Sequence, residues 1–172
     1  AEVMISELNT AIQYMAKRRI GALISIEQGN SLEEFINTGI PIHSDISNQL
    51  ITNIFIPNTP LHDGAVIIRD YKIAAAACYL PLSENKMIPK ELGTRHRAAI
   101  GLSEVSDAIT IIISEETGKV SVAIREKLHR ELSSSELVAV LSEQLVVEDQ
   151  GDAEPTIVRW VRDFFKGGRS NG

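Results

Sequence analysis

The 172-residue sequence predicts an α/β protein in which a central mixed β-sheet is flanked by helices. Two patterns lead to this prediction. Short apolar runs bounded by polar turns recur along the chain, as is typical of buried strands, and they alternate with segments whose apolar residues follow a helical period. With 44% hydrophobic residues, a chain of this length can bury a substantial core.

The first third of the chain is expected to begin with a helix over about residues 4–19. Its apolar positions follow a helical period, and its basic end complements the negative end of a helix dipole. The compact apolar run at 21–26 predicts a strand. The sequence Ser-Leu-Glu-Glu at 31–34 predicts a capping box that starts a short helix, which Gly39 ends. A further helix is expected over 46–55.

Two β-hairpins are expected in the middle of the chain. The first pairs residues 66–69 with 72–80, and the second pairs residues 109–114 with 119–124. A helix that begins at Gly93 is expected between them.

The last part of the chain divides into a final helix and a tail. The sequence Ser-Ser-Ser-Glu at 133–136 precedes an apolar helical run, so the domain is expected to cover residues 1–147. Residues 148–172 are expected to form a linker and an amphipathic tail. Docking of the tail on the parent domain is favoured over docking on a partner, and it predicts that Trp160 is shielded. The apolar residues that share one helical face of the tail are Ile157, Trp160, Val161, Phe164 and Phe165.

Composition limits the class of protein. No stretch approaches the roughly 20 apolar residues that span a bilayer, and the start lacks the features of a signal peptide. The sequence does not begin with Met, so a fragment of a longer chain is expected. Its one cysteine, Cys78, excludes an internal disulfide and a thiolate metal cluster, which fits a reducing compartment. The apolar neighbours of Cys78 indicate a small buried residue in a strand rather than a nucleophile.

Two short polar clusters carry the chemistry. Residues 60–65 read Pro-Leu-His-Asp-Gly-Ala, and residues 93–97 read Gly-Thr-Arg-His-Arg. In a protein of net charge −6, two arginines flanking a histidine produce a local positive field against the global sign. Such a field suits a small polyanion better than a nucleic-acid backbone. The clusters together therefore predict a phosphate site, and a role in binding nucleic acid is disfavoured.

The second cluster has the groups that bind phosphate. If Gly93 or Thr94 stands at a helix N-terminus, unpaired N–H groups and the positive dipole end favour anions. Arg95 and Arg97 can bind phosphate oxygens in bidentate fashion, and the Thr94 hydroxyl and His96 can each donate a hydrogen bond. The alternative is a solvated helix start with exposed basic side chains.

The first cluster adds a carboxylate. Asp63 can hold a divalent metal or draw a proton from a hydroxyl, and Gly64 lets a ligand approach the backbone. His62 can complete the shell of a hard metal ion. The alternatives are that Asp63 is an ordinary hairpin-turn residue and that His62 is a hydrogen-bonded loop residue.

The two clusters in combination resemble the diadenylate cyclases, the bacterial enzymes that join two ATP molecules into cyclic di-AMP. The resemblance extends from about Arg19 to about Leu145. The signature motifs of the family stand here as Asp63-Gly64-Ala65 and Arg95-His96-Arg97.

The resemblance is to the membrane-anchored type of the family, whose cyclase domain follows three transmembrane helices. Those helices are absent from this sequence. The resemblance therefore implies a fragment that works at the cytoplasmic face of the cell membrane. The DNA-scanning relative carries a DNA-binding region far longer than this tail.

The resemblance also implies a reaction. The 3′-hydroxyl of one ATP attacks the α-phosphorus of the other, pyrophosphate leaves, and the reciprocal attack closes the ring. Asp63 is implied to ligate Mn²⁺, Mg²⁺ or Co²⁺ and to assist deprotonation of the hydroxyl. The motif residues Arg95, His96 and Arg97 are implied to hold the triphosphate. Because the product is two-fold symmetric, a face-to-face homodimer is expected to be the active species.

Further residues are assigned around these motifs. Tyr79 and Leu80 are expected to stack on and cover adenine, with a core tyrosine as the alternative for Tyr79. Ser114 is expected to reach a phosphate, and Glu115 and Glu116 to help hold metal, with an ordinary polar hairpin turn as their alternative.

The same resemblance suggests two protein partners, a YbbR-domain regulator and phosphoglucosamine mutase. Two rival functions remain open. One is a sensor domain that binds ATP or cyclic di-AMP without turnover, and the other is an interaction module that works through the aromatic tail.

Overall fold

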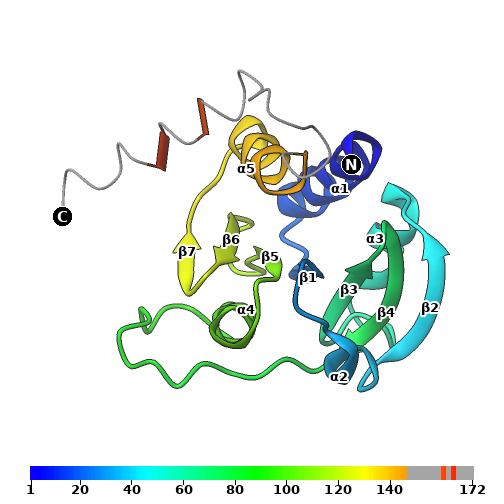
Figure 1. Ribbon diagram of the computed structural model, residues 1–172, viewed down its shortest axis with the longest axis horizontal. Coiled ribbons are helices and arrows are strands. Elements are labelled where there is room, and N and C mark those ends of the chain that lie inside the picture. The colour runs from blue at the N-terminus through cyan, green and yellow to red at the C-terminus, as the bar shows by residue number, and fades with distance from the viewer. Residues whose placement is uncertain (147–159, 162–163, 166–172) are drawn as a thin grey trace.

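The computed structural model describes residues 1–146, 160–161 and 164–165 of the chain. In this part of the chain, a seven-stranded sheet has the strand order β2-β4-β3-β1-β5-β6-β7, with helices on both faces (Figure 1). The strands are β1 (Ala22–Ile26), β2 (Ile40–Asp45), β3 (Ala65–Arg69), β4 (Lys72–Cys78), β5 (Ile109–Ile113), β6 (Val120–Ile124) and β7 (Lys127–His129). The helices are α1 (Glu2–Lys17), α2 (Glu33–Ile36), α3 (Asn48–Phe55), α4 (Thr94–Val105) and α5 (Ser134–Val146). The predicted α/β fold with a central mixed sheet is confirmed.

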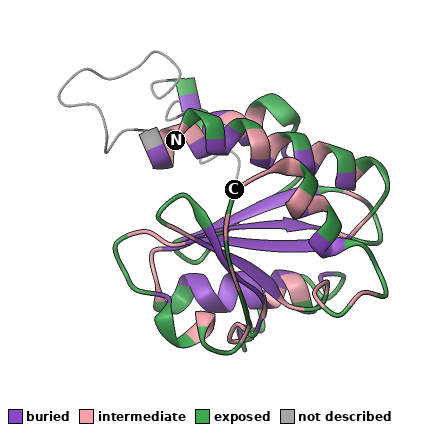
Figure 2. Cartoon of the chain, turned by 90° about the vertical axis from the view of Figure 1, so that its right-hand side faces the viewer, coloured by how far each residue is buried: buried purple, intermediate pink, exposed green. Residues whose placement is uncertain are grey.

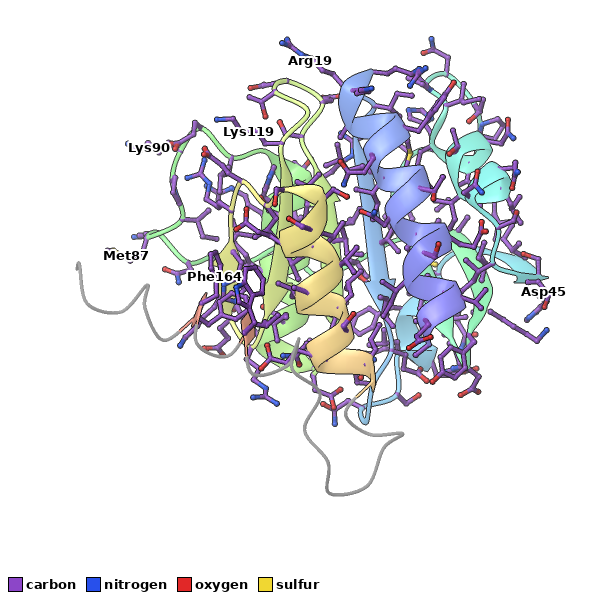
Figure 3. The ribbon with its side chains drawn as sticks, turned by 90° about the horizontal axis from the view of Figure 1, so that it is seen from above. Arg19, Asp45, Met87, Lys90, Lys119 and Phe164 are labelled. Carbon is purple, nitrogen blue, oxygen red and sulfur yellow. The ribbon has the colours of Figure 1, made fainter. Side chains whose placement is uncertain are left out.

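The helices divide between the two faces of the sheet. α1 and α5 lie side by side on one face, with α3 against α1, and α4 covers the other face (Figures 1 and 3). Successive side chains of β1 pack against the helices on opposite faces of the sheet, because strand side chains alternate between faces. Ile24 packs in the core with Leu8 of α1 and Leu141 of α5, whereas Leu23 packs in the core with Leu102 of α4. Figure 2 shows the buried strands between these two layers.

The sheet register gathers the two polar clusters at one end of the sheet. β1 runs parallel to β3 and antiparallel to β5, and β3 runs antiparallel to β4. Ala22 is paired with Ile113, and Ala65 is paired with Cys78. The residues just before β1 and β3 and just after β4 and β5 therefore meet at the same end. That end carries residues 21, 62–64, 79 and 114.

Two strands, β2 and β7, were not predicted from the sequence, and both lie at the edges of the sheet. β2 contains Pro41 and a register shift between Pro41 and Ser44, and His43 within that shift has a φ of 51°. An edge strand with a proline and mostly exposed side chains lacks the alternation that identifies a strand. β7 has three residues, too few for a period to be recognised.

A capping box was predicted at residues 31–34, whereas the structure has one at residues 133–136. The capping box at 31–34 is wrong, because Leu32 is the N-cap of α2 and makes no side-chain capping bond. Ser31 instead accepts a hydrogen bond from the Glu33 N–H at 3.2 Å. A reciprocal capping box does precede α5, where the Ser133 hydroxyl accepts from the Glu136 N–H and the Glu136 carboxylate accepts from the Ser133 N–H.

The expected linker lies outside the described residues. The four described tail residues are helical, and two of them pack on the domain. Val161 is buried, and the Phe165 ring lies 4.3 Å from the ring of His129. Trp160 is 50% exposed, so the prediction that it is shielded is wrong. The reason is that Val161 and Phe165 take the buried face, and Trp160 stacks on Phe164 outside it.

None of the helices in the described part of the chain has the length and apolar content that crossing a membrane requires.

Candidate active site

Two cavities adjoin the start of α4, at the end of the sheet where the polar clusters meet. We call the larger, of about 490 Å³, the aspartate cleft. Its lining includes the side chains of His62, Asp63, Thr94, Arg95 and Glu115, and the remaining lining residues are Leu23, Gly64, Cys78, Tyr79, Leu80, Leu82 and Ala98. The smaller, of about 260 Å³, we call the helix-start pocket, and its lining includes residues 91–96, 113–117 and 130–131. Thr94, Arg95 and Glu115 line both, so the two cavities adjoin each other at these residues.

Glycine at position 64 is required by the backbone beside Asp63. Gly64 has a φ of 95°, a conformation that side chains disfavour. A β-carbon there would lie 2.7 Å from the carbonyl oxygen of Cys78, because β4 bulges toward this turn at Ala77, whose φ is 54°. The predicted turn into β3 thus holds Asp63, which is exposed, at the mouth of the aspartate cleft. Ala65 of the same motif is buried in the core and lines neither cavity.

His62 is held in the tautomer that suits a metal ligand. Its Nδ1 lies 2.6 Å from the carbonyl oxygen of Thr59. Because a carbonyl can only accept, Nδ1 carries the hydrogen and Nε2 of the neutral ring keeps its lone pair. This is the arrangement in which a histidine donates one ring N–H to a carbonyl and ligates with the other nitrogen.

The start of α4 is open to an anion. Gly93 is the N-cap and brings no side chain to cap the helix, and the first intrahelical bond runs from the Arg97 N–H to the Gly93 carbonyl. In the described part of the chain, the N–H groups of residues 94–96 find no acceptor, so they are free for a ligand. The prediction of a helix that begins here is confirmed.

Arg95 occupies the junction of the two cavities. Its Nη1 lies 3.5 Å from Glu115 Oε2, and its side chain is 23% exposed. The guanidinium lies against Gly21, where a β-carbon would stand 2.6 Å from Nη1. Gly21, just before β1, therefore provides the space in which Arg95 lies.

The two other residues of the Arg-His-Arg motif take different positions. His96 is buried and lines the helix-start pocket, and burial lowers its pKa, with Arg130 and Arg95 adding to the effect. Arg97 lines neither cavity. Its backbone carbonyl accepts a hydrogen bond from the Ser83 N–H at 3.0 Å, which ties α4 to the segment that carries the cleft residues Leu80 and Leu82.

The residues expected at adenine lie in the aspartate cleft. β4 ends at Cys78, earlier than expected, so Tyr79 and Leu80 leave the sheet and line the cleft. Tyr79 is 75% exposed, which excludes the alternative of a core tyrosine. Cys78 itself is a buried strand residue, as expected, and burial raises the pKa of its thiol to about 11.

The residues of the β5–β6 turn divide between the cavities. Glu115 lines both, whereas Ser114 and Glu116 line the helix-start pocket alone. The Ser114 hydroxyl accepts hydrogen bonds from the N–H groups of Glu116 and Thr117, each at 3.3 Å. Its own proton is left free to donate to a ligand.

The donor types fit a hard divalent ion, but they are not assembled into a cage. Imidazole and carboxylates, from His62, Asp63 and Glu115, line one cleft. Among the described residues, no group of three or more His, Cys, Asp or Glu side chains is close enough to hold a metal ion. An ion at this position would need ligand oxygens to complete its shell.

Several lining residues have no signal in the sequence. Leu23, Leu82 and Ala98 appear there as ordinary apolar residues, and they form the wall of the cleft only through the fold. Lys119 and Arg130 line the helix-start pocket from the β5–β6 turn and from the residue after β7. Only the basic character of these last two could have marked them.

Comparisons with known proteins show which family this chain resembles. The family model described as DAC, DisA bacterial checkpoint controller nucleotide-binding, matches residues 9–128. Cyclic di-AMP synthase CdaA of Bacillus subtilis (strain 168) is 61% identical over 137 residues, which are 80% of this chain and 50% of that protein. Diadenylate cyclase of Listeria monocytogenes serotype 1/2a (strain 10403S) is 56% identical over 143 residues, 83% of this chain and 52% of that protein. The chain spans about half the length of these curated relatives.

Two solved structures share the fold. A double mutant of DacA from Staphylococcus aureus aligns with a TM-score of 0.81 at 56% identity, over 83% of this chain and 95% of that one. A hypothetical membrane spanning protein from Bacillus cereus aligns with a TM-score of 0.72 at 45% identity, over 74% of this chain and 63% of that one.

Proposed function

The chain belongs to the DAC family, the nucleotide-binding family of the DisA bacterial checkpoint controller, and from this premise we propose that it is a diadenylate cyclase domain. It condenses two ATP molecules into cyclic di-AMP and releases two pyrophosphates. The names of its relatives, cyclic di-AMP synthase and diadenylate cyclase, support this proposal.

The observation that carries the proposal is the meeting of the two motifs at one cleft. Asp63 and Arg95 are far apart in sequence, and both line the aspartate cleft, whose lining also includes apolar side chains. A nucleotide has the same division, with a flat apolar base at one end and a charged phosphate chain at the other. Leu80 and the exposed ring of Tyr79 suit the adenine, and the open start of α4 suits the phosphates.

The reaction needs positioning and charge stabilisation more than covalent chemistry from the protein. Arg95 and the free N–H groups of α4 stabilise the charge that develops on the α-phosphate. The Ser114 hydroxyl donates a hydrogen bond to a phosphate oxygen. Asp63, at the mouth of the cleft, lies where an incoming 3′-hydroxyl would approach and accepts its proton.

A divalent ion is the cofactor that these residues fit, and Mn²⁺, Mg²⁺ and Co²⁺ are the candidates. His62, Asp63 and Glu115 would hold it together with phosphate oxygens and water. When bound, the ion acts as a Lewis acid on phosphate and lowers the pKa of a bound hydroxyl. Glu116 lines the other cavity and would act farther along the phosphate chain.

The two-fold symmetry of the product favours two copies of the domain acting together. One cleft presents one nucleotide, so two clefts facing across a two-fold axis would bring each 3′-hydroxyl to the opposite α-phosphorus. We propose this homodimer as the active species. A dilution series at saturating ATP should show specific activity falling as light scattering shows the dimer dissociating, and constant activity from a pure monomer would refute it.

The full-length protein is proposed to be anchored at the cytoplasmic face of the cell membrane. The membrane spanning protein among its structural relatives supports this proposal. The YbbR-domain regulator and phosphoglucosamine mutase are proposed partners from the family resemblance alone.

One incubation tests the proposed reaction. The protein is mixed with ATP and Mn²⁺, and the products are identified by mass spectrometry beside an Asp63→Asn variant. We expect cyclic di-AMP and pyrophosphate from the wild type and almost none from the variant, because a neutral amide is a poor ligand for a hard cation. Bound ATP with no pyrophosphate would identify a silent sensor instead. Release of ADP or AMP alone would identify a hydrolase.

A further inference from the structure

α1 ends in a turn whose backbone conformation favours glycine. The Ile20 N–H donates to the carbonyl of Met15 at 3.0 Å, and the Arg19 N–H donates to that of Ala16 at 3.1 Å. These two bonds form a Schellman motif, in which the residue after the C-cap adopts the left-handed conformation. That residue is Arg19, with a φ of 52°. An arginine here costs backbone free energy that a glycine would not, so we asked what its side chain does.

The side chain of Arg19 reaches a turn of the candidate active site. Its Nη1 donates to the backbone carbonyl oxygen of Glu116 at 3.3 Å, a bond between residues 97 positions apart. Glu116 lies in the β5–β6 turn, which brings Ser114 and Glu115 to the cavities. Figure 3 shows Arg19 at the end of α1, beside this turn. The bond therefore joins the end of α1 to the turn that carries the proposed phosphate and metal ligands.

A second contact places the same turn on α1. Gly118 has a φ of 74°, and a β-carbon there would lie 2.4 Å from the carbonyl oxygen of Ala16 and 3.4 Å from Arg19 Cγ. The backbone of the turn thus packs directly on the last turn of the helix. The Gly118 N–H closes the β5–β6 turn by donating to the carbonyl of Ser114 at 2.8 Å. The end of α1 is therefore the support on which this turn rests.

The segment that follows Arg19 contacts the Glu115 side chain. A β-carbon at Gly21 would lie 3.1 Å from Glu115 Cβ, beside the guanidinium of Arg95. Glu115 Oε2 in turn lies 3.5 Å from Arg95 Nη1. Residues 19–21 therefore contact the β5–β6 turn twice, at its backbone through Arg19 and at Glu115 beside Gly21. A shift of the turn away from α1 would move Glu115 relative to Arg95.

The neighbouring Arg18 makes its contacts within α1. Its Nη1 donates to the Tyr14 carbonyl at 3.0 Å, and its guanidinium lies 3.5 Å from the centre of the Tyr14 ring. Arg18 and Arg19 bring the same charge to the negative end of the helix dipole, so any general electrostatic effect on the helix is shared by both. The contact with the β5–β6 turn distinguishes Arg19.

We propose that Arg19 is a positioning residue for the cyclase reaction. It holds the β5–β6 turn against the end of α1 and thereby keeps Ser114 and Glu115 in place at the two cavities. This inference rests on the proposed cyclase function. Arg19 lines neither cavity, and it acts through the backbone carbonyl of Glu116.

The test replaces Arg19 by glycine and measures stability and turnover side by side. The urea midpoint of Arg19→Gly should equal or exceed that of the wild type, because glycine suits the left-handed backbone. Its kcat/KM for ATP with Mn²⁺ should nevertheless fall about 5-fold, as expected from the loss of one ordinary hydrogen bond that positions the site. A residue with a merely structural role would lose stability and turnover together. The matched control is Arg18→Ala, which removes the same charge and should turn over ATP as the wild type does.

Hydrogen exchange measures the state of the turn without any turnover. Exchange of the Gly118 N–H, which is bonded within the turn, should be about 5-fold faster in Arg19→Gly and unchanged in Arg18→Ala. Wild-type turnover by Arg19→Gly would overturn the proposal. A loss of turnover without faster exchange at Gly118 would also overturn it, as would a fall of the urea midpoint in proportion to the loss of turnover.

The wild type separates this inference from the proposed function. If the wild type makes cyclic di-AMP and Arg19→Gly makes it equally fast, the positioning role alone is wrong. If the wild type makes no cyclic di-AMP, the proposed function fails, and the role of Arg19 in it fails as well.

Discussion

Gly21→Ala should damage the site while leaving the fold intact. A β-carbon at this position would lie 2.6 Å from Arg95 Nη1 and 2.7 Å from Cζ. Ordinary contacts between such atoms are about 3.5–4.0 Å, so the guanidinium must move by roughly 1 Å. A displacement of that size in a positioned group can cost on the order of 10²-fold in rate. We therefore expect kcat/KM for ATP to fall by about 10- to 100-fold.

The fold should tolerate this change because the two nearest atoms belong to the end of the flexible Arg95 side chain, and the next, Glu115 Cβ at 3.1 Å, needs to shift by only a few tenths of an ångström. Gly21 is not in the left-handed region, so alanine is allowed there and can even stabilise the chain by about 0.4–1 kcal/mol through the unfolded state. The assay is pyrophosphate release beside thermal unfolding. The control is Gly29→Ala, where the new β-carbon would meet the Asp107 carboxylate at 2.8 Å, away from both cavities. Turnover of Gly21→Ala equal to that control would refute the reasoning, as would loss of the fold.

Three further outcomes follow from the described geometry. Arg95→Ala should weaken binding of 3′-deoxyATP, which lacks the attacking hydroxyl, by about 1.5–3 kcal/mol in calorimetry. Arg97→Ala removes no cavity-lining group and should weaken this binding less. Equal losses would contradict the conclusion that only Arg95 of the two faces the cavities. Gly101→Ala should lower the free energy of unfolding, measured in urea, by about 1–3 kcal/mol, because the new methyl group would overlap the carbonyl of Pro81. A variant more stable than the wild type would show that the backbone at Pro81 can move away from α4. Burial, with nearby guanidinium groups, lowers the pKa of His96 below its unfolded value of about 6.5. The unfolded chain therefore binds the proton more readily, and the free energy of unfolding should decline as pH falls below about 6.5. Urea titrations from pH 7.5 to 5 should show a shallower decline for His96→Gln, and an identical decline would show that His96 is not its source.

The sequence was sufficient for those parts of the site that depend on local chemistry. An Asp-Gly turn before an apolar run placed Asp63 at the start of a strand, and the glycine at 93 marked the beginning of α4. Both conclusions need only neighbouring residues, because turn chemistry and helix starts are decided within a few positions. The sequence did not predict that Arg95 lines both cavities and Arg97 neither, because the residue that faces a cavity depends on how α4 packs on the sheet.

Residues that join the site through long-range pairing could not be found from the sequence. Gly21 lies under Arg95 only because β1 pairs with both β3 and β5. Arg130 reaches the helix-start pocket only because β7, a strand of three residues, adds to the edge of the sheet. Such positions follow from the order of the strands, and an isolated glycine or arginine has no periodicity from which that order can be inferred.

The position of Cys78 allows opening of the aspartate cleft to be measured by chemical labelling of its thiol. The thiol is the only one in the sequence, it is buried in the wall of the aspartate cleft, and its raised pKa leaves little thiolate at neutral pH. An alkylating reagent can therefore react only during excursions that expose this wall. The rate of labelling measures how often such openings occur, and its decrease with added nucleotide measures occupancy without any attached fluorophore.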